Sequence, residues 1–206
     1  MKIETLVLGL LKVNCYLLLT RDAAIVIDPG KYDERQKQFL SQNADKKRLI
    51  LITHAHFDHV LGAERLRNET GVDIAIGEIE APALKDKHLN LTDRFPATAN
   101  PIDADILLKD NQIFNLGNTE IMCKLVPGHT LGSLCYIIEG KLFSGDTIFY
   151  NTIGNTEFPG GDFNTLVASI KKLTNNLPDD TEVYSGHGEV TTVGFEKAYN
   201  PFLRSL

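Results

Sequence analysis

Thr53-His54-Ala55-His56-Phe57-Asp58-His59 holds four potential metal ligands within six residues. Imidazoles and a carboxylate suit zinc, iron or manganese better than calcium. The compact apolar run Arg48–Thr53 that leads into this stretch is typical of a buried strand, and Val60–Asn68 after it predicts a helix that ends near Gly71. The stretch is therefore expected to form a metal-binding loop at the edge of a sheet.

Two of the remaining histidines and one aspartate share a local setting. His129 and His187 each follow a predicted strand and have a glycine immediately before them, and Asp146 repeats this arrangement. Glycine lets the backbone turn sharply and carry a side chain to the edge of a sheet. Four strand ends are therefore expected to bring His and Asp side chains to one metal site. His88 fits none of this, and its polar surroundings predict an exposed residue in a helix.

The order of predicted elements indicates two sheets packed together with helices outside, in a single domain over residues 1–206. Two groups of strands are each followed by helices. The predicted strands are Ile3–Leu8, Val13–Thr20, Ala23–Ile27, Arg48–Thr53, Val72–Ile76, Gln112–Phe114, Thr119–Val126, Ser133–Glu139, Lys141–Ser144 and Thr181–Tyr184. The predicted helices are Asp33–Gln42, Val60–Asn68, one near Ile79–Lys87, one that begins at Asp162, and Phe195–Leu203; an irregular loop follows the third, up to Asp105.

Composition narrows the classes of protein that fit. The chain has 206 residues and a net charge of −6, which argues against a nucleic-acid partner bound through a basic face. No run of about 18 apolar residues is present, so no membrane span is expected. The segment Thr5–Leu11 resembles a signal peptide only faintly and is better read as a strand. Cys15, Cys123 and Cys135 are expected to be buried thiols of a reducing compartment, which predicts a cytoplasmic protein.

The motifs H-x-H-x-D-H, G-H-T, G-D-T and G-H-G together resemble the metallo-β-lactamase superfamily, most closely its glyoxalase II-like branch in a short single-domain form. The resemblance runs from Asn14-Cys15-Tyr16 to Asn200-Pro201-Phe202-Leu203 and includes Ile153–Asp162, a segment typical of short members. It implies an α/β fold, the four-layer αβ/βα sandwich, with the site at the mouth between the sheets.

The same resemblance implies a ligand set for two divalent ions, expected to be zinc, with iron or manganese as alternatives. His54, His56 and His129 would hold the first ion, and Asp58, His59 and His187 the second. Asp146 would bridge the two, and Asp28 would hold a ligand loop in place. Asp58 would also act in catalysis, by accepting a hydrogen bond from a metal-bridging hydroxide or by steadying its ion.

The reaction that the resemblance implies is hydrolysis of a small-molecule thioester such as S-lactoylglutathione. A thiolate leaving group, with a pKa near 8.5, needs no dedicated general acid. Two departures weaken the glutathione version: Asn155 stands where relatives usually carry Arg or Lys, and the C-terminal helical segment of full-length glyoxalase II is missing after His187. The candidate residues of the substrate pocket are Tyr150, Asn151, Asn155 and Phe158.

Several alternatives stay open. A persulfide dioxygenase would use one iron held by two His and one Asp on a related scaffold. A lactonase or a β-lactamase-like enzyme of the same fold is a second alternative, although β-lactamases lack a carboxylate at the position of Asp146. A ribonuclease is disfavoured by the acidic charge, and a flavo-diiron enzyme would carry Glu in place of His56. A non-catalytic zinc module is disfavoured because structural zinc sites close at four, mostly Cys, ligands.

Overall fold

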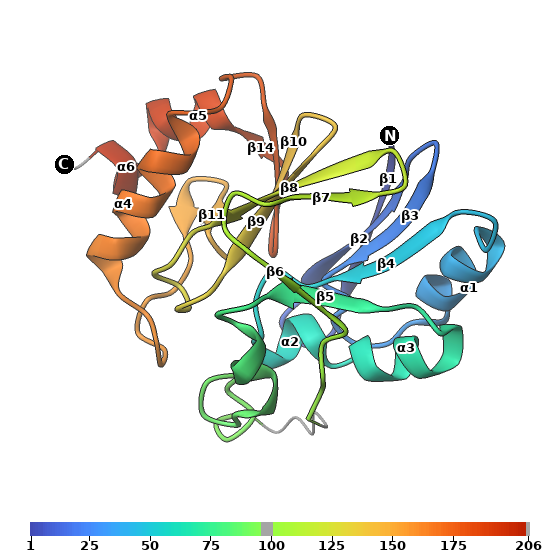
Figure 1. Ribbon diagram of the computed structural model, residues 1–206. Helices are drawn as coiled ribbons and strands as arrows, with labels where there is room; N and C mark the ends of the chain where they lie inside the picture. Colours follow the sequence, from blue (N-terminus) through green and yellow to red (C-terminus); the bar gives the residue numbers. More distant parts are fainter. Residues whose placement is uncertain (96–100, 205–206) are drawn as a thin grey trace.

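Two six-stranded sheets pack face to face in the computed structural model, which describes residues 1–95 and 101–204 (Figure 1). In the first sheet the strands follow one another in chain order: β1 (Lys2–Leu8), β2 (Val13–Leu19), β3 (Ala23–Ile27), β4 (Lys47–Leu51), β5 (Ile74–Gly77) and β6 (Ile106–Leu108). The second sheet has the order β14 (Thr191–Thr192), β13 (Glu182–Ser185), β10 (Lys141–Gly145), β9 (Leu134–Ile138), β8 (Thr119–Leu125) and β7 (Ile113–Leu116). A small hairpin joins β11 (Ile148–Phe149) to β12 (Thr152–Ile153).

Helices cover the outer faces of both sheets. The first sheet carries α1 (Glu34–Gln42), α2 (Phe57–Val60), α3 (Ala63–Thr70) and the 3-10 helix η1 (Ala81–Lys85). The second carries α4 (Phe163–Thr174), α5 (Val193–Tyr199) and α6 (Pro201–Arg204). This is the four-layer αβ/βα sandwich predicted from the sequence.

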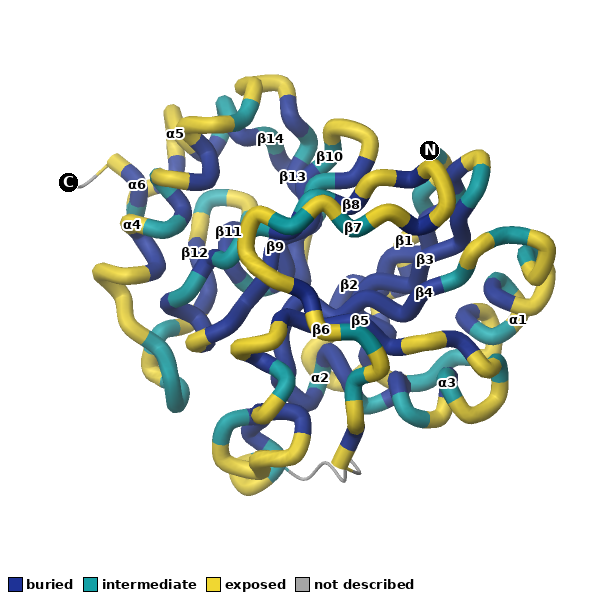
Figure 2. The backbone as a smooth tube through the Cα atoms, in the orientation of Figure 1, coloured by how far each residue is buried: buried dark blue, intermediate teal, exposed yellow. Residues whose placement is uncertain are grey.

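Strand β4 shows why its sequence is apolar without alternation. Leu49 and Leu51 join the core between the two sheets, while Ile50 joins the core under α1 and α3. A strand that is buried on both faces needs apolar side chains at every position. A third core lies between the second sheet and α4, where Leu166 and Ile170 pack. Figure 2 shows the result: central strands such as β2, β3 and β9 are mostly dark blue, whereas the edge strands β1 and β7 are largely exposed.

The prediction of a helix that begins at Asp162 is confirmed. The Asp162 side chain accepts a hydrogen bond from the Thr165 N–H at 2.7 Å and so caps α4. The predicted helix Val60–Asn68 is instead two helices, α2 and α3, interrupted at Gly62. The Gly62 N–H donates to the Gly30 carbonyl instead of to the preceding helical turn, and a Cβ at this position would meet the backbone nitrogen of Tyr32 at 2.6 Å. The last predicted helix is likewise divided, at Pro201, because proline lacks the N–H that would continue it.

Other local predictions need correction. Residues 79–87 form only the short 3-10 helix η1, and His88 lies in a turn rather than a helix, although it is exposed as predicted. The strands β6, β11, β12 and β14 were not predicted, since two or three residues are too few to show a period. Part of the predicted loop, residues 96–100, lies outside the described residues. The three cysteines are buried and unpaired, as predicted.

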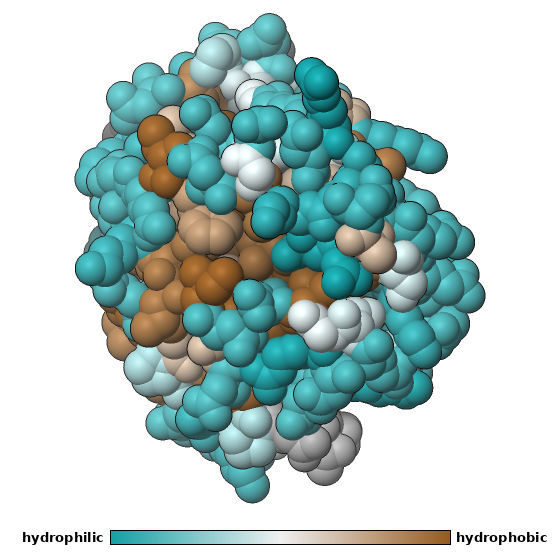
Figure 3. All heavy atoms as spheres, turned by 45° about the vertical axis from the view of Figure 1, so that its right-hand side comes forward, coloured by the Kyte–Doolittle hydropathy of each residue, from teal (hydrophilic) through white to brown (hydrophobic). Residues whose placement is uncertain are grey.

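Within the described ranges, none of the helices combines the length and the apolar character that a bilayer crossing requires. Figure 3 shows one face of the molecule, on which hydrophilic side chains cover most of the surface and apolar ones gather on the left of the view.

The fold brings four strand ends to one place. Strands β3 and β4 are parallel neighbours in the first sheet, and β10 and β13 are parallel neighbours in the second. Ligand sites of α/β proteins form outside the carboxyl ends of parallel strands. Asp28, His54, Asp146 and His187 all lie within three residues of such an end.

Candidate metal centre

The seven predicted ligands converge on one centre at these strand ends. Four come from the loop and first turn that follow β4, one from the loop between β8 and β9, and one each from the ends of β10 and β13. Their atoms form overlapping sets that could hold a metal: His54 with His56 and His129, His54 with His59 and Asp146, and Asp58 with His59 and His187.

The first group consists of three buried imidazoles, His54, His56 and His129. The His56 Nδ1 atom lies 3.1 Å from His54 Nε2 and 3.0 Å from His129 Nε2, and the two Nε2 atoms are 3.3 Å apart. Nitrogens that bind zinc at about 2.0–2.1 Å in a tetrahedron lie roughly 3.3 Å from each other. The three nitrogens therefore already have the spacing of ligands around one ion.

The second group consists of Asp58, His59 and His187. The Asp58 Oδ2 atom lies 3.7 Å from His59 Nε2 and 3.3 Å from His187 Nε2. Asp146 faces both groups, because its Oδ1 lies 3.3 Å from His59 Nε2 while its Oδ2 lies 3.5 Å from His187 Nε2 and 3.7 Å from His129 Nε2. This is the position expected of a bridging carboxylate.

Unpartnered buried atoms show that the donor set fits a cation. Among the described side chains, His59 Nε2 and Asp146 Oδ1 are buried without a hydrogen-bond partner, and both point into the centre. Buried polar atoms almost always have a partner, and a missing ion is one reason for an exception. His56 Nε2 is also unpartnered, but Nδ1 is the atom that faces the other ligands. Imidazole and carboxylate donors of this kind suit divalent transition metals.

The electrostatics differ between the two groups. Burial lowers the pKa of His54 and His129, and lowers that of His56 to about 3, because a charged imidazole would lose its hydration there. Burial opposes charge on His59 and His187 as well, but Asp146 and Asp58 outweigh it. These carboxylates hold the pKa of His59 well above its usual value and raise that of His187 to about 10.

Asp28 holds the second group and the ligand loop together, as the sequence predicted. Its Oδ2 lies 2.9 Å from His59 Nδ1 and accepts a hydrogen bond from the Thr53 hydroxyl at 2.7 Å, while its Oδ1 accepts from the Thr53 N–H at 2.8 Å. A carboxylate on the far nitrogen fixes the ring and its tautomer, so that Nε2 faces the metal. Asp28 also has a φ of 47°, in the left-handed region that aspartate tolerates better than most residues.

Three more ligand imidazoles are oriented through their far nitrogens. His129 Nδ1 lies 2.7 Å from the Asn155 carbonyl oxygen, and His187 Nδ1 lies 3.0 Å from the Leu11 carbonyl oxygen. His54 Nδ1 lies 3.0 Å from the Thr53 hydroxyl. Both carbonyls accept from Nδ1–H, which leaves Nε2 free to bind a cation.

Glu80 is a functional residue that the sequence analysis missed. It is 3 % exposed and accepts three hydrogen bonds: from the Ala55 N–H at 3.0 Å, the Thr130 hydroxyl at 2.9 Å and the Gly132 N–H at 2.9 Å. It thereby joins the loop that carries His54 and His56 to the loop that carries His129. Burial raises the pKa of Glu80, while the three donors oppose this shift. A lone acid in an irregular stretch carries no sequence signal of this kind.

The glycines before the ligands serve two different needs. Gly145 has a φ of 50°, so it supplies the turn predicted for a glycine before Asp146. Gly186 is needed for a different reason: its backbone lies against two of the ligands. A Cβ there would overlap Asp146 Oδ1 and lie 2.8 Å from His59 Cε1. Any side chain at Gly186 would therefore displace the centre itself.

The centre opens into a cavity of about 340 Å³. Asn155 and Phe158 line it, as predicted, together with Leu11, Phe57, Phe95 and several of the ligands. Tyr150 and Asn151 are not among its lining residues, so for them the prediction of a pocket wall does not fit. Tyr150 stacks on Phe195 of α5, and the Asn151 N–H donates to Glu196, which turns this segment toward α5.

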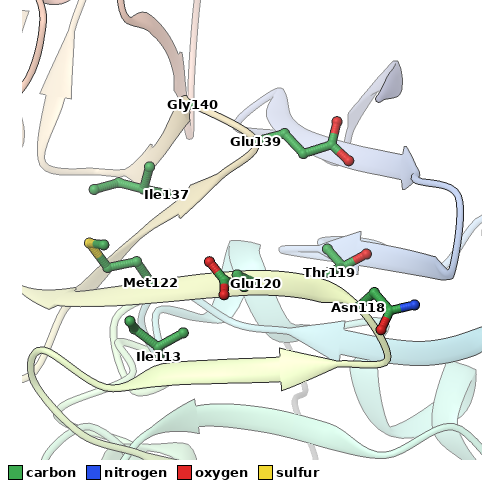
Figure 4. Close-up of a pocket in the computed structure, with 8 residues that line it drawn as sticks. All are labelled: Ile113, Asn118, Thr119, Glu120, Met122, Ile137, Glu139 and Gly140. Atoms are coloured by element: carbon green, nitrogen blue, oxygen red, sulfur yellow. The ribbon is translucent and has the colours of Figure 1, made fainter.

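Another hollow, of about 380 Å³, lies on the second sheet and holds none of the seven ligands. Its walls include Ile113 and Met122 from β7 and β8, with the carboxylates of Glu120 and Glu139 nearby (Figure 4). Glu139 already pairs with the N-terminal amine at 2.8 Å, and no histidine or cysteine lines the hollow. Of the two hollows, only the cavity at the metal centre is therefore lined by candidate metal ligands.

Comparisons with known proteins agree with this geometry. The family model of the metallo-beta-lactamase superfamily matches residues 8–187. The chain is 36% identical to the hydroxyacylglutathione hydrolase GloC of Haemophilus influenzae, over 100% of this chain and 99% of that protein. The crystal structure of the BLEG-1 B3 metallo-beta-lactamase superposes with a TM-score of 0.87 at 35% identity, over 99% and 100% of the two chains. That of TTHA1623 in a di-iron-bound form superposes with a TM-score of 0.83 at 30% identity, over 97% and 100%.

Proposed function

Because the chain belongs to the metallo-beta-lactamase superfamily, we propose that it is a metal-dependent hydrolase that cleaves small-molecule thioesters of the glyoxalase II type. The observation that carries the proposal is the position of Asp146, which faces both ligand groups: its Oδ2 lies near His129 and His187, and its Oδ1 lies near His59. That arrangement suits two ions held side by side rather than one.

The residues have distinct parts in such a reaction. His54, His56 and His129 would hold one ion, Asp58, His59 and His187 the other, and Asp146 both. When bound, two divalent ions lower the pKa of a coordinated water toward 7 and polarise the carbonyl that is attacked. Asp58 borders the cavity. Its carboxylate would accept a hydrogen bond from the attacking water and orient it. Phe95 and Phe158 form apolar walls that limit access of other water.

A thioester is favoured by the leaving group and by the relatives. The described residues of the cavity include no side chain placed as a general acid beyond the ligands themselves. A thiolate with a pKa near 8.5 leaves without protonation, whereas an amine or alkoxide leaves poorly. The likeness to a hydroxyacylglutathione hydrolase over the full length of both chains supports the same class.

The test is a hydrolysis assay with purified protein whose metal content has been measured. S-lactoylglutathione and S-acetyl-N-acetylcysteamine should be cleaved, a chelator should abolish cleavage, and added zinc, iron or manganese should restore it. His129→Ala should remove activity, while His88→Ala is the matched control, since His88 is exposed and outside the centre. If neither thioester is cleaved by metal-replete protein, the proposal is wrong.

A β-lactam is the second candidate substrate, favoured by the 35% identity to the BLEG-1 B3 metallo-beta-lactamase. Turnover of nitrocefin, a β-lactam, is measured in the same assay and compared with turnover of the two thioesters. Faster turnover of nitrocefin than of either thioester would replace the first proposal by this one. Oxygen uptake with glutathione persulfide, measured on the same sample, would instead identify a persulfide dioxygenase.

A further inference from the structure

A groove of about 460 Å³ lies next to the cavity at the metal ligands. The two hollows share Leu11, Phe57, Asp58 and Phe95 as lining residues, so a ligand that is bound in the cavity lies close to the groove. Beyond these shared residues its walls are mostly apolar and include Leu10 and Leu61. Leu10 and its neighbour Leu11 are 93% and 45% exposed, so they present an apolar surface at this groove.

Two cations line the same groove. Arg65 is already engaged, since its Nε donates to Glu69 at 2.7 Å and its guanidinium lies 3.7 Å from the centre of the Tyr32 ring. Lys31 differs, because it takes part in none of the ion pairs formed by the described residues. A lysine ammonium at the rim of an apolar groove is a point charge that attracts an anionic end group such as a carboxylate.

We propose that this groove binds one arm of the substrate, an unbranched apolar chain that ends in a carboxylate, with the carboxylate at Lys31. The inference rests on the proposed thioesterase function and specifies its substrate class. The reacting carbonyl would lie over the metals, the methylenes of the arm would cover Leu10, Leu11 and Leu61, and the terminal charge would meet the lysine. The anionic end of the substrate is thus placed at the turn after β3 rather than at Asn155.

The experiment compares matched pairs of thioesters that differ only in a terminal carboxylate. Adipoyl- and hexanoyl-N-acetylcysteamine place the charge on the acyl arm. The acetyl thioesters of 6-sulfanylhexanoate and of hexanethiol place it on the thiol arm. In one of the two pairs the charged member should have a KM about two- to fivefold lower, the range expected for an exposed ion pair. Lys31→Gln should remove this preference and Lys31→Glu should reverse it.

Two controls separate a local effect from a general one. Lys172→Glu changes the net charge equally but lies on α4, outside the groove, so it should leave the preference intact. Leu10→Ser should raise the KM of the six-carbon substrates more than that of S-acetyl-N-acetylcysteamine, and its exposure makes a folding defect improbable. Equal KM values within both pairs, or a preference that survives in Lys31→Glu, would overturn the proposal.

Binding without turnover distinguishes failure of this inference from failure of the proposed function. Calorimetry should show that heptanedioate binds more tightly than heptanoate, and that Lys31→Glu abolishes the difference. If no thioester is cleaved but this difference is found, the groove is assigned correctly and the thioesterase is not. If thioesters are cleaved but neither assay depends on Lys31, the thioesterase proposal stands and the assignment of the groove is wrong.

Discussion

The two halves of the metal centre are built differently. His54, His56 and His129 are buried neutral rings whose loops are tied together by Glu80, so this half carries no charge of its own. The other half contains Asp58 beside His59 and His187, shares the Asp146 carboxylate, and reaches the surface at His187, whose side chain is 26% exposed. From this difference we infer that, in the proposed reaction, the first half would hold its ion rigidly and the second half would face the reacting water.

The largest effect is expected from Asp58→Ala. If the second half orients the attacking water, turnover should fall by about 10²–10⁴-fold, the usual contribution of a positioned proton acceptor. The measurement is kcat of metal-replete protein, with far-UV circular dichroism to show that the fold is retained. If the folded, metal-replete variant keeps nearly wild-type turnover, Asp58 has no part in the mechanism. The inference that the second half orients the attacking water would then be wrong.

Metal content tests whether both halves bind an ion. Wild-type protein loaded with metal should approach two ions per chain by elemental analysis, and Asp146→Ala should lower this number because the shared carboxylate is lost. We expect the second half to lose its ion first, since it is more exposed and Asp146 supplies part of its charge. Replete wild-type protein that holds a single ion and consumes oxygen with glutathione persulfide would favour the dioxygenase instead.

Glu80 tests the rigidity of the first half. Glu80→Ala leaves the Ala55 and Gly132 N–H groups without an acceptor, and a buried unpartnered group costs about 1–3 kcal/mol. The free energy of unfolding in urea should therefore fall by about 2–4 kcal/mol, and Glu80→Gln should recover only part of it.

Glu78→Ala is the matched control for Glu80, because Glu78 is exposed and faces only Lys109, at 4.0 Å. It should change stability by less than about 0.5 kcal/mol. Equal losses in the two alanine variants would show that the link between the two loops contributes nothing particular to this half.

The smallest expected effect concerns Asn155, which lies beside the first half. Its carbonyl orients His129, while its side-chain oxygen accepts from the Glu157 N–H at 2.8 Å. Asn155→Arg offers a charged fork to a substrate carboxylate, so KM for S-lactoylglutathione should fall several-fold with little change in kcat. An unchanged or higher KM would show that the side chain of residue 155 does not face the substrate.

The seven ligands could be proposed from the sequence because they lie in short motifs, four in the segment after a predicted buried strand and three directly after a glycine. Two sheets with helices outside were also predictable, from the continuous apolar run Arg48–Thr53 and the helical period after Asp162, whereas the four-layer arrangement was implied by the resemblance of the motifs to the metallo-β-lactamase superfamily. Glu80 and the groove at Lys31 were not, because their partners are far away in the chain: Glu80 meets Gly132 through a backbone N–H, which leaves no mark in the sequence. The packing of Tyr150 and Asn151 toward α5 was not predictable for a related reason, since the sequence of a short turn does not indicate which way it faces.

The hydrogen bond between Leu11 and His187 has a consequence for the nascent chain. The ligand His187 is oriented by the turn that follows β1, and Asn14 and Tyr16 of β2 donate to the Ser185 carbonyl that precedes it. His187 is the last ligand of the second half to be translated, after every member of the first half, whereas the turn after β1 and the strand β2 that support it are translated before any ligand. Domains that depend on such distant pairings fold slowly. Synthesis therefore completes the first half of the centre before the second, which has Asp58 and His59 early but lacks His187 until later.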